Sequence, residues 1–384
     1  MKIVVTANYS PWSPYTGGGQ RSAHCLASAF ATFEHDVTAV FTRVFGESVP
    51  VPGDLPYRLR FARMPSRRSR VDAPLRPLTA ATVAAEIVRL RPDVVHANGE
   101  EAALLGSLKS RLGFTLVVTP RYPSFPRQMF RQRPEFTARL DLWRRHTKYA
   151  MLGRALRAAD RWCPTSESSG RVVRRAYGLD GDKMHVIRNG IGEDFLALSP
   201  VTSRRDELVF FGRLNRTKGV FDLLEAVSRL PGRAPRLCYV GRGEAAGTLR
   251  ARARALGIRD RVDFVDWMAP AALARRVAHA RIVVLPSWEE SFGNAIAETM
   301  ASGTPLVTTR VGSIPELADE STALLVPPRS PDALALAIAR VLEQPEESHR
   351  RARAARALAR SRFSWQRAAR EFLELFARAG PRRE

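Results

Sequence analysis

The sequence predicts an α/β protein built from two doubly wound domains. Short apolar runs alternate with amphipathic stretches along the chain, which is typical of parallel sheets whose strands are joined by helices. Between residues 190 and 206 this alternation stops, and glycine, serine and proline gather there as they do in a hinge. A length of 384 residues suits two domains. We therefore expect a first domain at 1–190, a second at 191–362 and a terminal segment at 363–384.

The first half of the chain contains four strand candidates and three helix candidates. The strand candidates are short runs rich in apolar and β-branched residues, and the helix candidates place apolar residues three or four positions apart. Strands are expected at residues 2–7, 36–41, 93–97 and 115–119, and helices at 22–32, 79–90 and 102–112.

The second half repeats this pattern. Strands are expected at residues 208–211, 236–240, 262–265, 282–285 and 306–308, and helices at 221–230, 248–256, 271–279, 295–301 and 331–342. In open α/β sheets, ligands bind beyond the carboxyl ends of the strands. The residues that directly follow strands are therefore the candidates for chemistry.

The chain is strongly basic, with 61 Lys and Arg against 38 Asp and Glu and a net charge of +23. Such a field favours an anionic partner, although a general preference for Arg as the surface cation would produce the same excess. The three cysteines are too far apart in sequence for a metal-ligand pattern or a disulfide framework. With no signal-peptide pattern and no apolar span of membrane length, we expect a cytoplasmic protein, with peripheral contact at the inner face of an acidic membrane as an option.

A loop at residues 212–219 has the composition of an anion site. It follows the strand candidate at 208–211 and carries Arg213 and Lys218 between glycines. Arg offers a planar fork of donors and Lys a compact charge, so the two suit one anionic group. Lys218 is also the only lysine of residues 191–384. The alternative is a solvated turn with incidental bases.

A second candidate loop runs from Ser287 into a helix that begins near Gly293. A helix N-terminus presents unpaired N–H groups and a positive dipole end, which suit a phosphate. Glu290 and Glu298 lie eight positions apart, and carboxylates accept hydrogen bonds from sugar hydroxyls. The alternative is that both are ordinary surface acids.

Several segments, in order, resemble retaining glycosyltransferases of family 4, which have the GT-B fold. The resemblance covers nearly the whole chain. The matching segments are residues 17–19, 91–97, 158–167, 186–191, 212–219, 290–298, 301–306 and 312–316. It implies two Rossmann-like domains facing a cleft, with the terminal helix at 363–384 crossing back to the first domain. The implied reaction moves a sugar from a UDP- or GDP-sugar to an acceptor hydroxyl with retention at the anomeric carbon.

The resemblance also implies roles for the matching residues. Arg213 and Lys218 would bind the donor diphosphate and Glu290 would hold the donor sugar, and these three are the catalytic candidates. Glu298 would accept hydrogen bonds from the ribose hydroxyls. The remaining donor-binding candidates are Gly18 and Gly19, which would crowd the phosphate from the first domain, the main chain of Ser291, Phe292, Gly293 and Asn294, and the region of Val265 and Trp267 at the base.

The acceptor side departs from the family pattern. Arg121 stands where members usually carry a His near the reacting sugar, and Asn98 stands where many carry a second His; His96 matches the strand-end His. Arg cannot act as a base at neutral pH, so Arg121 would instead bind an anionic acceptor or a donor oxygen. These three residues are the acceptor-side candidates, and the acceptor is expected to be anionic or lipid-linked.

No metal or other cofactor is expected, because fixed cations and a helix N-terminus can stabilise the departing diphosphate. Asp180-Gly181-Asp182 spells the signature of metal-using glycosyltransferases, but it lies outside the expected donor domain and is interpreted as a turn.

Other interpretations stay open. A non-catalytic scaffold with this fold is the main alternative, followed by a dinucleotide-dependent oxidoreductase, from the glycines of 241–247, and a nucleic-acid-modifying transferase, from the net charge. Residues 127–149 are compatible with a helix in a lipid headgroup layer or with a plain core helix. The apolar stripe of that segment is Phe136, Leu140, Trp143 and Thr147, and Arg139, Arg144, Arg145 and Lys148 lie off it.

Overall fold

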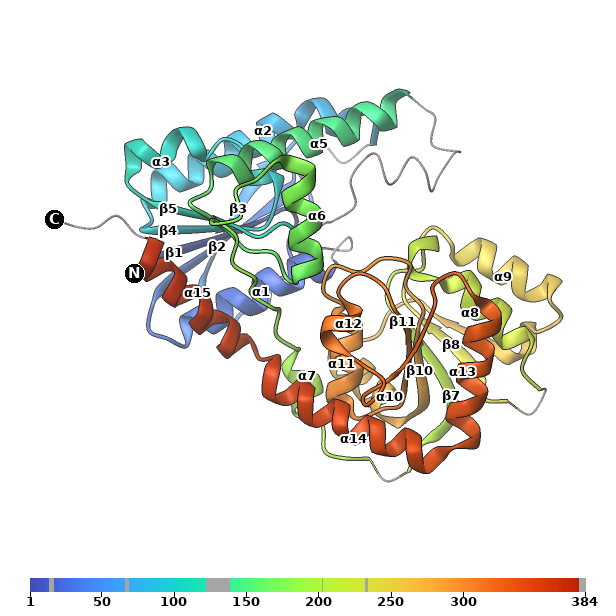
Figure 1. The fold of residues 1–384 in the computed structure, drawn as a ribbon. Helices are drawn as coiled ribbons and strands as arrows, with labels where there is room; N and C mark the ends of the chain where they lie inside the picture. The colour runs from blue at the N-terminus through green and yellow to red at the C-terminus, as the bar shows by residue number, and fades with distance from the viewer. Residues whose placement is uncertain (14–16, 66–68, 122–138, 202, 232–233, 380–384) are drawn as a thin grey trace. The chain divides into compact units, whose positions relative to one another are not determined.

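The computed structural model describes residues 1–13, 17–65, 69–121, 139–201, 203–231 and 234–379. Its main-chain contacts divide the chain into two units (Figure 1). The first comprises Met1–Gly190 and Trp365–Glu384, and the second comprises Ile191–Ser364. The terminal helix therefore packs with the first unit, although it follows the second in sequence.

The first unit is a parallel six-stranded sheet in the order β3-β2-β1-β4-β5-β6. Its strands are β1 (Lys2–Ala7), β2 (Asp36–Val44), β3 (Arg58–Met64), β4 (Val94–Ala97), β5 (Thr115–Val118) and β6 (Arg161–Trp162). Its helices are α1 (Gly18–Ala31), α2 (Ser69–Leu90), α3 (Gly106–Leu112), α5 (Arg139–Ala158), α6 (Glu167–Tyr177) and α15 (Trp365–Ala379).

Helices cover both faces of this sheet (Figure 1). The side chains of β1 alternate between the faces: Ile3 and Val5 belong to the core beneath α1 and α15, whereas Val4 belongs to the core beneath α2 and α5. On the first of these faces, Phe30 of α1 meets Phe376 of α15 with ring centroids 5.6 Å apart. This aromatic contact fixes the terminal helix on the first unit.

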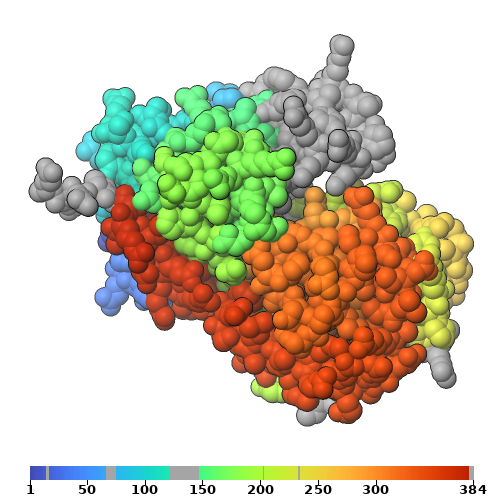
Figure 2. Space-filling model, in the orientation of Figure 1, coloured from blue at the N-terminus to red at the C-terminus, as the bar shows by residue number. Residues whose placement is uncertain are grey.

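The second unit has the same plan, with a parallel sheet in the order β12-β11-β10-β7-β8-β9. Its strands are β7 (Arg205–Phe211), β8 (Arg236–Val240), β9 (Val262–Val265), β10 (Ala280–Leu285), β11 (Leu306–Thr309) and β12 (Leu324–Val326). Its helices are α7 (Glu193–Leu196), α8 (Val220–Ser228), α9 (Ala246–Ala255), α10 (Pro270–His279), α11 (Asn294–Ser302), α12 (Ile314–Leu317), α13 (Pro331–Glu343) and α14 (Pro345–Arg362). Figure 2 shows α13 and α14 at the surface of this unit.

The predicted fold class is confirmed, but some elements differ from expectation. Strand β3 was not among the expected strands, and its residues Arg58, Arg60 and Arg63 alternate with apolar residues. It is the edge strand of its sheet, and there arginines remain solvated while they discourage pairing with another chain. Helix α2 begins ten residues before the expected start, and α3 begins at Gly106 because residues 100–102 form a separate 3₁₀ turn. None of the helices in the described ranges has the length and apolar composition of a membrane span.

Candidate functional site

The loop after β7 is held by close backbone contacts that only glycine allows. Gly219 has φ +65°, and a Cβ at this position would lie 1.9 Å from the carbonyl oxygen of Pro286. Ahead of it, the side chain of Asn215 accepts a hydrogen bond from the main-chain N–H of Lys218 at 3.1 Å. These contacts fix Lys218 directly beside the end of β10, and Arg213 is exposed on the same loop.

The loop after β10 joins the first loop through both backbone and side chains. The N–H of Trp288 donates to the carbonyl oxygen of Thr217 at 2.8 Å. Lys218 Nζ donates to Glu290 Oε2 at 2.5 Å, and the hydroxyl of Ser287 donates to the same oxygen at 3.4 Å. The side chains of Lys218 and Glu290 are 30% and 16% exposed, so a ligand can still reach the pair. The structure thus brings together two candidates that are 72 positions apart in sequence.

Helix α11 begins at this pair. Its N-cap is Gly293, with φ +92° and no side-chain cap, so the first turn presents backbone N–H groups and a positive dipole end. Asn294 and Glu298 are both partly exposed, and their separation of four positions places them on one side of the helix. Phe292 does not share this exposure, because its side chain is buried and meets Phe363 edge to face at 5.7 Å.

The loops after β8 and β9 complete this edge of the sheet. Gly241 has φ +147°, its N–H donates to the carbonyl oxygen of Val265 at 2.8 Å, and a Cβ would lie 1.9 Å from the carbonyl oxygen of Gly212. A Cβ at Gly243 would lie 2.0 Å from the carbonyl oxygen of Leu214. The glycines of 241–243 therefore serve to pack this loop on the loop after β7, which explains them without a dinucleotide.

Trp267 lies just beyond β9 and is 63% exposed. The predicted residues of the second unit thus lie in the loops at the carboxyl ends of β7, β9 and β10, at the end of β9 itself, or in the first turns of α11. These strands belong to one run of neighbours in the sheet.

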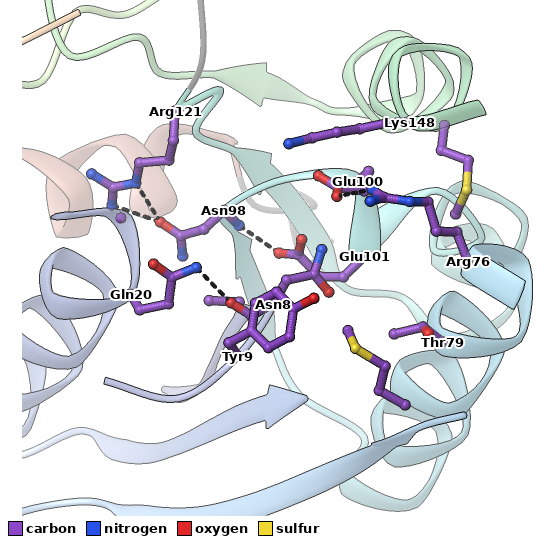
Figure 3. A pocket seen from close by; sticks show the side chains of 14 residues that line it. Asn8, Tyr9, Gln20, Arg76, Thr79, Asn98, Glu100, Glu101, Arg121 and Lys148 are labelled. Atoms are coloured by element: carbon purple, nitrogen blue, oxygen red, sulfur yellow. Dashed lines mark hydrogen bonds and ion pairs between the residues drawn. The ribbon is translucent and has the colours of Figure 1, made fainter. Parts of the chain in front are cut away.

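A polar pocket of about 110 Å³ opens in the first unit, also at the carboxyl ends of its strands (Figure 3). Residues after β1 and β4, the start of α1, and helices α2 and α5 contribute to it. The lining residues are Ala7, Asn8, Tyr9, Gly19, Gln20, Met64, Arg76, Thr79, Asn98, Glu100, Glu101, Arg121, Lys148 and Met151. Gly19, Asn98 and Arg121 were predicted from the sequence as site residues; Gly18, beside them, is exposed at the start of α1.

Arg121 is oriented in this pocket by two amides. Its Nε and Nη2 donate to Asn98 Oδ1 at 2.8 and 2.6 Å, and its Nη1 donates to Asn189 Oδ1 at 2.8 Å. The amide of Asn98 in turn donates to the carbonyl oxygen of Thr6 at 2.8 Å. Asn98 thus positions the guanidinium, because its Oδ1 accepts two hydrogen bonds from Arg121. A neutral histidine has a single acceptor nitrogen.

Two buried carboxyl groups in this pocket escaped sequence reasoning. Glu101 is 1% exposed and accepts hydrogen bonds from the main-chain N–H of Asn98 at 2.9 Å and the hydroxyl of Thr6 at 3.1 Å. Burial, helped by the charge of Glu100, raises the pKa of Glu101 to about 7. Burial also opposes ionisation of Glu100, but Lys148 and Arg76 outweigh it and lower the pKa of that carboxyl. The signal in the sequence was an acidic pair directly after a strand and ahead of an apolar run.

The structure corrects the expectation that His96 contacts an acceptor. The side chain of His96 is 0% exposed and lies in the core, with its ring 4.6 Å from that of Phe372 and its Nε2 2.9 Å from the hydroxyl of Thr119. Burial, helped by the charge of Arg121, lowers the pKa of His96 to about 3. His96 is the last residue but one of β4 and pairs with Val5 of β1, so the pleat turns its side chain to the face of the sheet that α1 and α15 cover.

Two further interpretations concern residues outside these loops. Asp180 accepts a hydrogen bond from the N–H of Asp182 at 3.0 Å, which confirms the turn. Among the residues with described positions, no group of three or more His, Cys, Asp or Glu is placed to hold a metal ion. Phe136 lies outside the described residues, as do the side chains of Leu140 and Trp143, so the headgroup-layer hypothesis stays a prediction.

Comparison with known families assigns both halves of the chain. Residues 205–344 match the model described as glycosyl transferases group 1, and residues 16–195 match the model of glycosyltransferase family 4. An α-(1→4)-mannosyltransferase of Mycolicibacterium hassiacum is 30% identical over 299 residues, which cover 75% of this chain and 71% of the relative. A glycogen synthase of Mycobacterium tuberculosis is 35% identical over 217 residues, 55% of this chain. The chain matches only about half (52%) of the length of that synthase.

Solved structures show the same fold at low sequence identity. A sucrose-phosphate synthase from Thermosynechococcus elongatus superposes with a TM-score of 0.80 at 22% identity, over 98% of this chain and 99% of the other. The HepE protein of Anabaena, solved in complex with UDP, has a TM-score of 0.75 at 19% identity, over 98% and 100%. Together with the family models and the mannosyltransferase, these likenesses show that the chain belongs to the group 1 and family 4 glycosyltransferases and has their GT-B fold.

Proposed function

We propose that this chain transfers a hexose from a nucleoside diphosphate sugar to an acceptor hydroxyl, with retention at the anomeric carbon and without a metal. The observation that carries the proposal is the joining of Lys218 and Glu290 at the N-terminus of α11, with Arg213 exposed on the adjoining loop. The complex of the similar HepE structure with UDP-glucose supports the choice of donor class.

The second unit supplies a positive site for a diphosphate. Arg213 and Lys218 bring two formal charges, and α11 adds backbone N–H groups that favour an anion. As the bond to the sugar breaks, negative charge grows on the departing diphosphate, and donors fixed in place stabilise that charge without reorganising. Binding requires Lys218 to exchange its hydrogen bond to Glu290 for one to the diphosphate.

The same geometry suggests roles for the carboxylates of Glu290 and Glu298. Once Lys218 turns to the diphosphate, Glu290 can accept hydrogen bonds from hydroxyls of the donor sugar. Glu298, which is partly exposed on α11, would accept hydrogen bonds from the ribose hydroxyls. The exposed Trp267 and the main chain near Val265 would contact the base.

Calorimetry with UDP, GDP and ADP tests donor binding. Lys218→Met removes one charged partner of the diphosphate and should cost roughly 1.5–3 kcal/mol, so the nucleotide that binds the wild type should bind at least tenfold more weakly. Lys183→Met is the matched control, because it removes a lysine from a turn of the first unit. Equal affinity of Lys218→Met and the wild type would contradict the assignment.

Metal independence and retention need their own measurements. Turnover should survive excess EDTA, because side-chain cations and a helix N-terminus supply the positive charge. Activity that vanishes with EDTA and returns with Mn²⁺ would overturn this part of the proposal. The anomeric configuration of the first product, followed by proton NMR, should match that of the donor, and an inverted product would refute retention.

A further inference from the structure

The side chain of Trp288 is held at the point where the two loops of the proposed donor site meet. We propose that Asp222 and Arg329 are positioning residues for the transfer, because together they fix Trp288. A fixed Trp288 keeps Glu290 aimed at the donor sugar when Lys218 turns to the diphosphate. The inference rests on the proposed function, because it concerns how the same site keeps its shape while the donor binds. It is carried by contacts at the backbone, the edge and the face of one tryptophan.

The backbone of Trp288 joins the two loops directly. Its N–H donates to the carbonyl oxygen of Thr217 at 2.8 Å, and Thr217 precedes Lys218 in the loop after β7. Two hydrogen bonds thus tie the loops together, one through this backbone and one between the side chains of Lys218 and Glu290. Donor binding opens the second bond. The position of Glu290, two residues beyond Trp288, then depends on Trp288 staying in place.

Asp222 holds the edge of the indole. It lies in the first turn of α8 and is half-buried, and its Oδ2 accepts a hydrogen bond from Trp288 Nε1 at 2.6 Å. Helix α8 follows Gly219, which is itself packed against the carbonyl oxygen of Pro286. The hydrogen bond therefore ties the ring to the element that continues the loop of Lys218, and not to the ring's own loop.

Arg329 covers the face of the same indole from the loop after β12. Its guanidinium carbon lies 4.6 Å from the centroid of the Trp288 ring, which is within the range of a cation–π contact. Its backbone has φ +58°, a left-handed conformation that persists only where the surrounding structure imposes it. Burial raises the pKa of Asp222, and the hydrogen bond from Trp288 opposes this rise. The charges of Arg329 and Arg216 oppose it as well, so Arg329 also favours the ionised acceptor of that hydrogen bond.

The carbonyl groups before and after Trp288 are fixed from another side. The hydroxyl of Thr309, at the end of β11, donates to the carbonyl oxygen of Ser287. The N–H of Ser313, at the start of α12, donates to the carbonyl oxygen of Glu290 at 3.2 Å. The segment is therefore bound at both ends to one side, while its indole is bound to α8 and to the loop after β12. Loss of the indole contacts would free the middle of the segment without detaching its ends.

The experiment separates the contribution of the sugar from that of the nucleotide. Calorimetry gives the dissociation constant of UDP, GDP or ADP divided by that of its glucose, galactose or mannose conjugate, for the conjugate that binds the wild type most tightly. Asp222→Ala and Trp288→Phe each remove the hydrogen bond and should lower this ratio roughly fivefold. Arg329→Met should lower it roughly threefold. The affinity for the nucleoside diphosphate itself should stay the same in all three variants.

Two further variants and one control distinguish positioning from mere packing. Asp222→Asn keeps an acceptor oxygen and should restore the ratio of the wild type. The double variant Asp222→Ala/Trp288→Phe should be no worse than either single variant, because both changes remove the same bond. Glu225→Ala is the matched control, because it removes another carboxylate of α8, one that accepts from Arg252 at 2.8 Å, and it should leave the ratio unchanged. Thermal melts confirm that the variants are folded.

Three outcomes would overturn the inference: an unchanged ratio in Asp222→Ala, an equal loss of affinity for the nucleoside diphosphate and its conjugate, or a ratio in Asp222→Asn as low as in Asp222→Ala. If the wild type binds a nucleoside diphosphate and its conjugate while one of these outcomes occurs, the proposed function stands and only the positioning role fails. If the wild type binds no nucleoside diphosphate, or no conjugate, the proposed function fails and the inference fails with it. The two failures are therefore distinguishable.

Discussion

Replacing His96 with methionine should make the first unit less sensitive to acid. In the folded chain, burial and Arg121 lower the pKa of His96 from 6.5 to about 3, while in the unfolded chain the ring titrates near its ordinary value. Between these values the unfolded state binds a proton that the folded state excludes, so stability is lost as the pH falls below 6.5. At pH 5 the loss relative to pH 8 is about 2 kcal/mol, because the unfolded ring is then protonated about thirtyfold over its neutral form.

Urea denaturation at pH 8 and pH 5, followed by hydrogen exchange of peptides from β4, reports on the first unit. The wild type should lose about 2 kcal/mol more than His96→Met between the two pH values. Methionine suits the aromatic surroundings of His96 and does not titrate. Thr119→Val is the control, because it removes the hydrogen-bond partner of the ring and keeps the titrating group. If His96→Met and the wild type lose equal stability, the ring is not excluded from protonation and the burial argument is wrong.

Three further predictions are tested by urea denaturation, with hydrogen exchange of peptides from the unit concerned and calorimetry for nucleotide binding. Burial and Glu100 raise the pKa of Glu101 from 4.5 to about 7, so between these pH values the folded state holds a proton that the unfolded state releases. Stability should therefore fall by roughly 3 kcal/mol as the pH rises through this window. Glu101→Gln should abolish that fall, and an unchanged fall in the variant would contradict the prediction. Gly219→Ala should destabilise the second unit and weaken nucleotide binding at least tenfold, because the new Cβ would lie 1.9 Å from the carbonyl oxygen of Pro286. Gly257 also has a positive φ, +68°, but has open space around it, so Gly257→Ala should cost only about 1 kcal/mol of backbone strain. Equal effects of the two variants would refute the packing argument. Arg204 donates to the carbonyl oxygens of Ala278 and Gly303 at 2.6 Å each, so Arg204→Met should destabilise the second unit by about 3 kcal/mol. Arg205 is exposed, and Arg205→Met is the control. If Arg204→Met loses no more stability than Arg205→Met, these hydrogen bonds contribute little.

Periodicity predicted most of the sheet but not its edges. Strand β1 was predicted with its observed bounds, because a central strand buried on both faces is an uninterrupted apolar run. Strand β3 alternates arginine with Leu59, Phe61 and other residues. Its assignment as a strand depends on its pairing with β2, which the sequence of β3 alone does not show. An edge strand needs no continuous apolar run, so residues 58–64 were not among the expected strands.

The two loops that we propose as the donor site could be anticipated for a physical reason. They follow strands directly, and both the glycines and the lone lysine of the second half stand out in composition. The hydrogen bond between Lys218 and Glu290 could not be anticipated, because it depends on β7 and β10 being neighbours in the sheet. In the same way, the pocket of the first unit draws on segments that run from β1 to α5. The charge environment of Glu100 could be recognised only once the fold had placed Arg76 and Lys148 near it.

The sequence by itself determined the two doubly wound units and the loops in which chemistry is to be sought, because strand and helix periods and glycine positions are local properties of the chain. The tertiary structure alone decided which of the candidates are accessible. His96 and Asn98 are two residues apart, yet the first is enclosed by aromatic rings while the second faces a pocket. Burial depends on what packs against a strand end, and α15, which covers His96, comes from the opposite end of the chain.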